Sequence, residues 1–503
     1  MQKELMEKFK EELLEISYLS SAVAVLHWDQ EVNMPSKGND LRAKIIGSLS
    51  GELHNKFTSD NFEKLLLELR KEMDAGKLSD EDNCIVRESW REFSREKKLP
   101  LNFVKELAET TSKAQMIWAK ARKKNDFKLF LPELKKIVAL KRKEAKLVGY
   151  KDSPYNALLD IYEPYVDVEE IEMIFSELKD FLVPFLAKIK KSKVKINSNT
   201  LKGNFAIEKQ VKFNEFVAKK IGFDFEAGRL DKSTHPFTIG FHPQDVRITT
   251  RYDEKDLFHS INSTIHETGH ALYDQGILLE GFGTPLGESI SLGIHESQSR
   301  MWENIIGKSE IFWQYFYPKM QKDFSESFER IKLSDFYKAI NIVRPSLIRT
   351  EADEVTYNLH IILRFEIEKD LIEGSIAVED LPQIWNDKFK EYFGIKVSSD
   401  AMGVLQDVHW SGGMIGYFPT YTLGNLYSAQ FFNTAKRDIL NLEKEIKRGQ
   451  FGHILEWLRK NIHIHGKLFS AEQLVEKVTG EKLTSKYFID YLEKKYSKIY
   501  ELK

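Results

Sequence analysis

Apolar residues recur at intervals of three and four over most of the first 220 residues, and this is the spacing of one helix face. Examples are the stripes Leu5, Phe9, Leu13 and Ile16, then Leu41, Ile45, Ile46 and Leu49, then Phe62, Leu65, Leu66 and Leu69. Breaks fall at Met34–Gly38, Leu99–Pro100 and Gly149–Tyr150, where Pro or Gly interrupts the pattern. We therefore expect a series of amphipathic helices up to about residue 220.

The pattern changes between about 222 and 252, where β-branched and aromatic residues alternate with turn residues, as in Phe237–Phe241. This predicts a small hairpin or short sheet. Helical spacing returns over about 254–279, stops at Phe282–Gly287, and resumes over Glu288–Ile306. The short sheet therefore lies directly before two predicted helices.

Helical patterns dominate again from 309 onward, with interruptions at Val343–Pro345 and Trp410–Gly424 and a predicted helix start at Ile348–Asp353. No Pro/Ser-rich linker divides the chain, and no repeat at a fixed period is visible. We predict a mainly α protein, one helical body with two lobes around a groove and a small sheet beside it. The expected organisation is a single domain over 1–503, with a helical lobe at about 1–220, a sheet and metal-site region at about 222–306, and a helical remainder at about 309–503.

Composition narrows the function classes. The chain has 42% hydrophobic and 30% charged residues and a formal net charge of −2. This balance gives no support to charge-driven binding of nucleic acid or of a membrane surface. The single cysteine, Cys84, rules out an intramolecular disulfide framework. Neither a secretory signal nor a run of 18 apolar residues is visible, so we expect a cytoplasmic protein without a membrane span.

The stretch His266-Glu267-Thr268-Gly269-His270 carries the candidate chemistry. On a helix, His266 and His270 lie one turn apart on one face, so both ring nitrogens can reach one divalent metal. Glu267 leaves the helix about 100° away from His266, beside the metal. There it can accept a proton from a metal-activated water as a general base. The alternative is a chance match on an ordinary helix.

A catalytic zinc needs a third protein ligand from another element. His295 and Glu296 are the candidates on the following predicted helix, and helical phase alone does not separate them. We favour Glu296, because HExxH followed by a glutamate on a second helix is the common arrangement in such sites. The alternative for Glu296 is an ordinary i,i+4 ion pair with Arg300.

A second polar region follows much later in the chain. The stretch Gly403–Trp410 precedes the loop Gly412–Tyr421, which is rich in glycine and tyrosine. Such a loop can bring phenol or imidazole donors to a developing oxyanion. It can equally be a helix connection with ordinary aromatic packing.

Taken together, these motifs resemble the carboxypeptidase Taq family of metallocarboxypeptidases. The similarity runs in order through most of the chain, and its motifs are His27–Gln30 with Met34-Pro35, His235–Phe237, Asp245–Thr249, His266–His270, His295–Gln298, Ile348–Asp353 and Gly403–Trp410. The resemblance implies a helical fold like those of neurolysin and angiotensin-converting enzyme, with a deep groove and usually a homodimer. It also implies removal of single residues from free peptide C-termini with broad specificity, using zinc or cobalt.

The resemblance also implies roles for individual residues. His266, His270 and Glu296 would bind the metal, and Glu267 would be the general base. Arg349 would bind the terminal carboxylate of the substrate, for which a planar guanidinium is well suited. The groove would be lined by His235, Arg247, Gln406 and His409. Tyr417 would steady the oxyanion, with Tyr421 as second choice.

The resulting hypothesis is a metallocarboxypeptidase in which the metal, together with Tyr417 or His409, holds the oxyanion. Arg349 would limit how far a peptide enters and so make the enzyme an exopeptidase. The nearest rival is a metal-dependent oligoendopeptidase on the same fold. A rival of another class is a helical peptide-binding scaffold without turnover.

Overall fold

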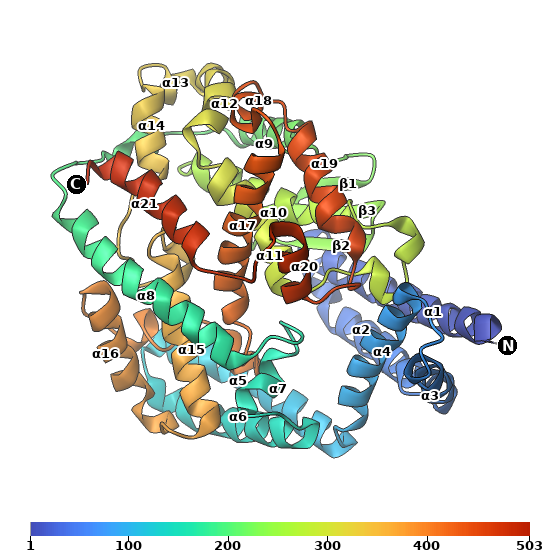
Figure 1. The fold of residues 1–503 in the computed structure, drawn as a ribbon. Coiled ribbons are helices and arrows are strands. Elements are labelled where there is room, and N and C mark those ends of the chain that lie inside the picture. The colour runs from blue at the N-terminus through green and yellow to red at the C-terminus, as the bar shows by residue number, and fades with distance from the viewer. Residues whose placement is uncertain (1, 503) are drawn as a thin grey trace. The chain divides into compact units, whose positions relative to one another are not determined.

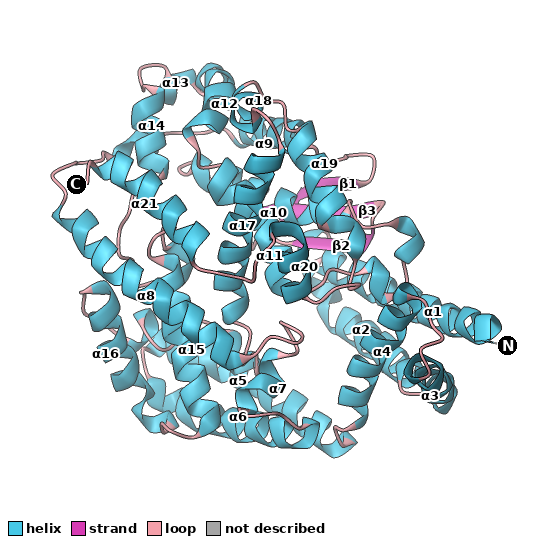
Figure 2. Ribbon diagram, in the orientation of Figure 1, coloured by secondary structure: helices cyan, strands magenta, loops and turns pink. Residues whose placement is uncertain are grey.

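Helices form most of the described chain, and its β structure is one three-stranded sheet (Figure 1, Figure 2). The computed structural model describes residues 2–502. The chain divides into two compact units, each made of three separate stretches. Unit 1 comprises Met1–Lys97, Asn197–Ile340 and Phe431–Lys482, and unit 2 comprises Lys98–Ile196, Asn341–Gln430 and Leu483–Lys503. The predicted mainly α class is confirmed.

Unit 1 contains the sheet and the first four helices of the chain. Its helices are α1 (Gln2–Val32), α2 (Asn39–Phe57), α3 (Asp60–Asp74), α4 (Asp80–Lys97), α9 (Ile207–Ile221), α10 (Leu257–Asp274), α11 (Leu292–Arg300), α12 (Glu310–Asp323), α13 (Ser325–Phe328), α14 (Leu333–Ile340), α18 (Leu442–Lys447), α19 (Gly452–Asn461) and α20 (Ala471–Thr479). The sequence breaks at Met34–Gly38 and Leu99–Pro100 fall between helices, as predicted.

In the described residues of unit 2, the regular secondary structure is helical. Its helices are α5 (Leu101–Lys124), α6 (Phe127–Val148), α7 (Pro154–Leu159), α8 (Val168–Lys191), α15 (Tyr357–Glu373), α16 (Leu381–Phe393) and α21 (Lys486–Tyr500). Helix α17 (Pro419–Asp438) begins in unit 2 and ends in unit 1. Unit 2 also contains the 3₁₀ turns η6 (Arg349–Glu351) and η9 (His409–Gly412).

The predicted short sheet is confirmed at β1 (Gly228–Lys232), β2 (Thr238–His242) and β3 (Asp245–Thr250). The strand order is β1-β3-β2, with β1 parallel and β2 antiparallel to β3, so β2 forms one edge. Val246 and Ile248 of β3 are fully buried against Ala271 of α10 and Ala218 of α9. Burying an Ile or Val side chain contributes about 2 kcal/mol, so this small core fixes α10 on the sheet.

Two helix boundaries differ from the predictions. Helix α11 begins at Leu292 rather than at Glu288, because the Ser291 hydroxyl caps it by accepting from the Ile294 amide at 3.1 Å. The chain then continues from Met301 to Ile306 as the π-helical segment η5. Helix α17 already begins at Pro419, inside the predicted interruption at Trp410–Gly424, since proline suits the first turn of a helix.

The predicted helix start at Ile348–Asp353 is also wrong. This stretch holds only the 3₁₀ turn η6, and α15 begins at Tyr357. Asp353 instead accepts hydrogen bonds from the Val355 and Thr356 amides at 3.0 Å each, just ahead of α15. Side chains of this type favour turns and helix entries over helix interiors. Among the described residues, no helix has both the length and the apolar character that crossing a membrane requires.

Candidate metal centre and polar cluster

Helix α10 carries the two histidines of the HExxH motif. It starts where the Asp256 carboxylate accepts a hydrogen bond from the His259 amide at 3.0 Å. Four residues apart, His266 and His270 project from one face, and their ring centroids lie 4.9 Å apart. The predicted placement of the two imidazoles is therefore confirmed.

Gly269 explains how α11 comes close to these histidines. A Cβ at this position would lie 2.6 Å from the Ser299 Cα and 2.8 Å from the Gln298 carbonyl oxygen. Only glycine leaves room for that approach. As a result Glu296 of α11 places its Oε2 3.2 Å from Nε2 of His270 and 3.7 Å from Nε2 of His266.

These three side chains form a set that can hold a metal. One donor atom each from His266, His270 and Glu296 lies within 4.8 Å of the others. Two imidazole nitrogens and one carboxylate are a common ligand set for zinc, with a further position left open. His295, the alternative third ligand, does not belong to this set. Its Nε2 lies 2.9 Å from Oδ1 of Asp274 instead.

The surroundings of Glu296 and His270 favour the ionised carboxylate and the neutral imidazole, the states in which these side chains bind a metal. Burial opposes ionisation of Glu296, but Arg300 and then His266 hold the pKa of this carboxyl well below its usual range. The Nε of Arg300 lies 2.6 Å from Oε1 of Glu296, so the predicted i,i+4 pair exists beside the second carboxylate oxygen. Burial and neighbouring His295 lower the pKa of His270 to about 4, which leaves its ring neutral.

His266 is fixed by a residue that the sequence analysis did not single out. Its Nδ1 lies 2.7 Å from Oε2 of Glu303, which is held by the π-helical segment η5. This contact directs Nε2 toward the other two donors. Burial alone would lower the pKa of His266, but Glu296 and Glu303 together raise it to about 9. Without a metal the ring is therefore protonated, and metal binding would displace that proton.

Glu267 lies beside the donor set rather than in it. It is 6% exposed, and its Oε2 accepts a hydrogen bond from the Thr238 hydroxyl at 2.7 Å. Thr238 belongs to the edge strand β2, so the sheet positions this carboxylate. Burial raises the pKa of Glu267, and this brings it closer to the range in which a carboxyl can both accept and return a proton.

Two other predicted residues of unit 1 lie on or next to the sheet. Arg247 of β3 makes a bidentate pair with Asp245 at 2.9 Å for each contact, and it stacks over Trp28 at 4.2 Å. His235 precedes β2 and is exposed, and its carbonyl accepts from the Ser233 hydroxyl at 2.6 Å. Neither residue belongs to the set of metal donors.

Unit 2 contains a buried cluster around Arg349. Both Nε and Nη2 of Arg349 donate to Oδ1 of Asp407, at 3.1 and 2.9 Å, and Nη1 donates to the Tyr357 hydroxyl at 3.1 Å. Arg364, which is fully buried, donates from Nε to Oδ2 of the same Asp407 at 2.7 Å. Two guanidinium groups thus share one carboxylate, and the cluster keeps one excess positive charge.

Gln406 holds the segment that carries Arg349. Its Oε1 accepts from the Arg349 amide at 2.9 Å, and its Nε2 donates to the Leu347 carbonyl at 3.0 Å. Gln406 is 7% exposed, and both ends of its amide are used in this way. Its observed contacts therefore position Arg349.

The three candidates for oxyanion stabilisation lie together in unit 2. The ring centroid of His409 is 5.5 Å from that of Tyr417 and 6.4 Å from that of Tyr421, and the two tyrosine rings are 5.3 Å apart. The hydroxyl of Tyr421 lies 3.4 Å from Nε2 of His409. Burial lowers the pKa of His409 to about 4, so its ring is neutral.

A buried carboxylate fixes the loop that carries these residues. Glu368 of α15 accepts hydrogen bonds from Nε1 of Trp410 at 2.7 Å and from the Gly416 amide at 2.9 Å. It also accepts from the Tyr155 hydroxyl at 2.8 Å. The sequence analysis missed this residue, together with Thr238, Asp274, Glu303 and Arg364. Glu303 and Asp274 had a usable signal, since Glu303 lies seven residues after Glu296 and Asp274 four residues after His270, and such spacings place side chains on one helix face.

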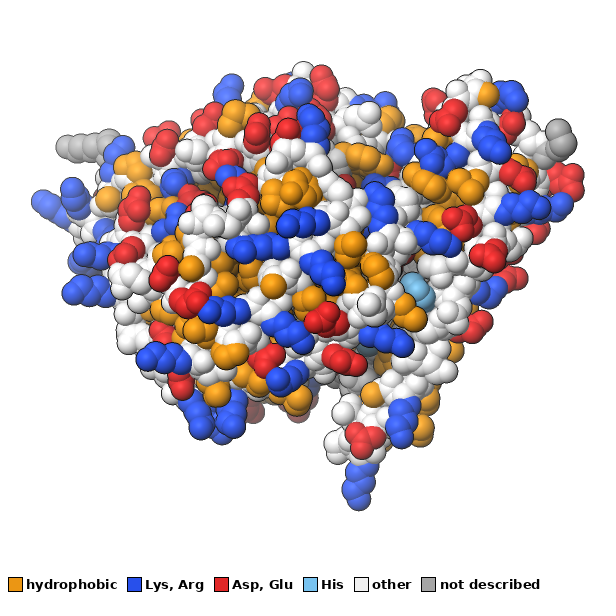
Figure 3. Space-filling model, turned by 90° about the horizontal axis from the view of Figure 1, so that it is seen from below, with side chains coloured by type: hydrophobic (Ala, Val, Ile, Leu, Met, Phe, Trp, Pro, Cys, Tyr) orange, Lys and Arg blue, Asp and Glu red, His pale blue; other side chains and the backbone are white. Residues whose placement is uncertain are grey.

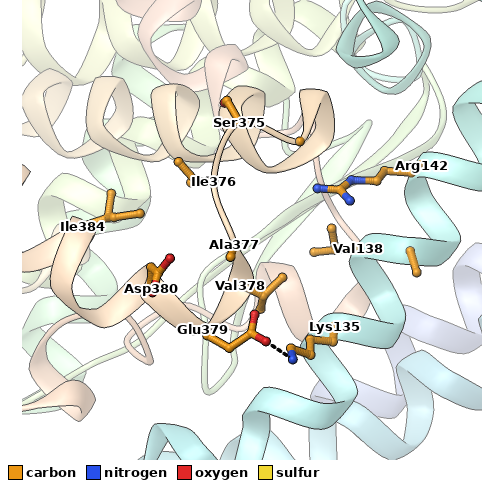
Figure 4. Close-up of a pocket in the computed structure, with 12 residues that line it drawn as sticks. Lys135, Val138, Arg142, Ser375, Ile376, Ala377, Val378, Glu379, Asp380 and Ile384 are labelled. Atoms are coloured by element: carbon orange, nitrogen blue, oxygen red, sulfur yellow. Dashed lines mark ion pairs between the residues drawn. The ribbon is translucent and has the colours of Figure 1, made fainter.

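Two features of the surface are its charge distribution and a depression in unit 2 (Figure 3, Figure 4). On the face shown in Figure 3, basic and acidic side chains are interspersed, as the near-zero net charge predicts. A depression of about 710 Å³ in unit 2 lies between α6 and the segment after α15 (Figure 4). Its lining includes the ion pair of Lys135 with Glu379 and the side chain of Arg142. None of the residues predicted for the site lines it.

Comparison with known proteins gives full-length matches. The profile described as carboxypeptidase Taq (M32) metallopeptidase matches residues 8–496. Carboxypeptidase 1 of Bacillus subtilis is 42% identical over 495 residues, covering 98% of each chain. Thermostable carboxypeptidase 1 of Thermus thermophilus is 42% identical, covering 97% of each chain.

Solved structures agree in fold as well as in sequence. The M32 carboxypeptidase from Deinococcus radiodurans has a TM-score of 0.95 at 35% identity, with 99% of this chain and 100% of that chain covered. Metallocarboxypeptidase 1 of Trypanosoma cruzi has a TM-score of 0.94 at 36% identity, with the same coverage.

Proposed function

Because this chain belongs to the carboxypeptidase Taq (M32) family and is a metallocarboxypeptidase, we propose that it releases single residues from free peptide C-termini with broad specificity. The observation that carries the proposal is the convergence of three metal donors beside a buried glutamate. Family membership implies a divalent metal.

We assign the metal to His266, His270 and Glu296, with zinc as the expected ion and cobalt as an alternative. A divalent metal held there would supply Lewis acidity toward a carbonyl oxygen and a water molecule. Glu267 then accepts the proton of the attacking water and returns it to the leaving amine. Its burial and its contact with Thr238 support this role, since they hold the carboxylate in place and favour reprotonation.

Arg349 is the proposed anchor for the terminal carboxylate of the substrate. A guanidinium group has five N–H donors, and Asp407 and Tyr357 use three of those of Arg349. Two donors are thus left for a planar, bidentate partner such as a carboxylate. The excess positive charge of the cluster supports the same assignment, and Gln406 would hold Arg349 in position.

Tyr417, Tyr421 or His409 would donate to the developing oxyanion. His409 is neutral and can donate from one ring nitrogen, and both tyrosines carry a hydroxyl donor. His235 and Arg247 are proposed to contact the substrate from the sheet side of unit 1.

The test is mass spectrometry of one short peptide and its C-terminally amidated twin. Each is incubated with metal-stripped enzyme and again after zinc or cobalt is restored. A ladder of single losses from the free C-terminus, seen only with metal, is the expected result. Internal cuts in both peptides would contradict the exopeptidase proposal and indicate an oligoendopeptidase.

Four further properties are proposed with it. We expect zinc as the bound ion, which elemental analysis checks, and a homodimer, which light scattering checks. A single catalytic domain over 1–503 is supported by the family match to residues 8–496. A cytoplasmic location is consistent with one buried cysteine, Cys84, and cell fractionation tests it.

A further inference from the structure

The two histidines of the candidate metal centre are held differently. Nδ1 of His266 pairs with Glu303 at 2.7 Å. Nδ1 of His270 is buried and has no hydrogen-bond partner among the described residues 2–502. A metal-binding histidine usually donates its second ring nitrogen to an oxygen, which fixes the orientation of the ring. His270 therefore needs another restraint.

The ring of His295 supplies a contact of the right kind. It stacks on the ring of His270, with centroids 4.5 Å apart and planes inclined by 18°. Stacking confines the plane of an imidazole, although it makes no bond to Nδ1. Rotation about the last side-chain bond of a histidine is otherwise broad, so an unrestrained ring could turn Nε2 away from its partner donors.

Asp274 fixes His295 in that position. It lies four residues after His270, so His266, His270 and Asp274 occupy successive turns of the same face of α10. Its Oδ1 lies 2.9 Å from Nε2 of His295. Strand β2 confines Asp274 from another side, since a Cβ at Gly240 would lie 2.8 Å from its Oδ2.

A second aromatic layer supports His295. The ring of Tyr273 lies 5.4 Å from that of His295, and the ring of His463 lies 4.9 Å from that of Tyr273. Tyr273 is fully buried. The rings of His270, His295, Tyr273 and His463 are thus in contact one after another, and the ring of His295 has little room to tilt.

We infer that His295, held by Asp274, is a positioning residue that orients the metal-binding ring of His270 by stacking. Neither residue binds the metal in this inference, and the inference rests on the proposed metal role of His266, His270 and Glu296. His295 therefore fixes the direction in which Nε2 of His270 points at the metal position.

Two substitutions separate stacking from hydrogen bonding. His295→Phe keeps a flat ring beside His270 but loses the contact with Asp274. His295→Gln keeps a polar group that can reach Asp274 but loses the ring. The control is His453→Gln, which alters an exposed histidine in α19 that pairs with Glu445 at 2.9 Å in the same unit.

The readouts are the dissociation constant for zinc, measured by competition with a chromophoric chelator, and the visible absorption spectrum of the cobalt-substituted protein. We expect His295→Gln to weaken zinc binding about 10- to 100-fold and to alter the cobalt spectrum, as removal of a supporting residue does. His295→Phe should stay closer to the native protein in both readouts. The control His453→Gln should have the same zinc affinity and cobalt spectrum as the native protein. Circular dichroism checks that each variant is folded.

The outcomes are distinct. If the native protein binds no zinc or cobalt, the proposed metal centre fails. If the native protein binds metal and His295→Gln binds it equally well with an unchanged spectrum, the positioning inference is overturned. It is also overturned if His295→Phe is more disturbed than His295→Gln, because hydrogen bonding would then be the restraint that matters.

Discussion

The proposed metal centre of unit 1 and the Arg349 cluster of unit 2 are both buried groups of charged side chains, but glutamates predominate in the first and guanidinium groups in the second. The first contains Glu267, Glu296 and Glu303; Arg300 is within hydrogen-bonding distance of the last two, and Lys308 also pairs with Glu303 at 3.6 Å. Two guanidiniums surround the second, with Asp407 between them. An incompletely balanced buried cluster favours a ligand of opposite charge. The donor set of carboxylate and imidazole groups in unit 1 therefore supports the proposed cation, and the paired guanidinium groups of unit 2 support the proposed anion.

The two regions also differ in how far apart in the sequence their contributing segments lie. The donors and supports of the metal centre come from α10, α11 and η5, apart from Thr238 of β2. The cluster combines η6, α15 and the segment before η9. Spacing within one helix pair is visible in a sequence, whereas pairing between distant segments is not.

The largest expected effect is on turnover, when Glu267 beside the proposed metal centre is replaced. Glu267→Gln should lower kcat by about 10³-fold, because a general base is lost, while the bound metal remains. Peptide hydrolysis assays together with elemental analysis check both parts. Substantial remaining turnover would remove Glu267 from the role of base, and loss of the metal would make it a structural support.

The next effect tests the anionic ligand of unit 2. Arg349→Ala should weaken kcat/KM for a free-acid peptide by about 100-fold, as loss of a buried charge contact does. An amidated peptide should be affected far less. Arg349→Lys keeps the charge but loses the planar guanidinium group. Its kcat/KM for the free-acid peptide should lie between the values of the native protein and of Arg349→Ala. Equal effects on both peptides would contradict the anchor assignment.

A smaller effect tests the support of His266. Glu303→Gln should weaken zinc binding about 10- to 100-fold, because the imidazole loses the carboxylate that orients it. Competition with a chelator measures this. Asp407 is not one of the metal donors, so Asp407→Asn should leave zinc binding unchanged. A parallel loss in that variant would show that removing any buried carboxylate charge weakens binding, and that the contact of Glu303 with His266 is not the cause.

The smallest effect concerns Glu368. Burial raises its pKa from the usual 4.5 to about 7, so the folded protein binds this proton more tightly than the unfolded chain does. Its contribution to stability is complete below about pH 4.5 and is lost as the pH rises through 7. As the pH rises from about 4.5 through 7, the unfolding free energy of the native protein should fall by about 1–3 kcal/mol. The unfolding free energy of Glu368→Gln should fall by less over the same pH range.

Urea unfolding at mildly acidic and mildly alkaline pH measures the difference. Glu366 of the same helix is the matched control, because its pKa is shifted in the opposite direction. Burial alone would raise the pKa of Glu366, but hydrogen bonds from Lys179, Lys388 and Tyr392 lower it. Stability from Glu366 is present above its usual pKa and is lost only at lower pH. Glu366→Gln should therefore leave the pH trend intact, and an identical trend in both variants would show that Glu368 is not its source.

Helical phase left Glu296 and His295 as alternatives, and the choice of Glu296 rested on the common arrangement of such sites. The sequence by itself determined the helical class, the short sheet before α10, and the helix face shared by His266 and His270. Each depends on local periodicity or on spacing within neighbouring helices, which the chain encodes directly. The order of the motifs also gave the family. The helix start at Leu292 and the turn at η6 were misjudged, because a capping hydroxyl and an Asp side chain set those boundaries, not the apolar pattern.

Only the tertiary structure decided which groups support the site. Glu303 meets His266 through η5, Thr238 reaches Glu267 from β2, and His295 lies on His270 because Gly269 admits α11 so closely. The sharing of Asp407 by Arg349 and Arg364 joins residues more than forty positions apart. Such contacts depend on how buried polar groups find partners across the fold, and no spacing rule along a single chain contains that information.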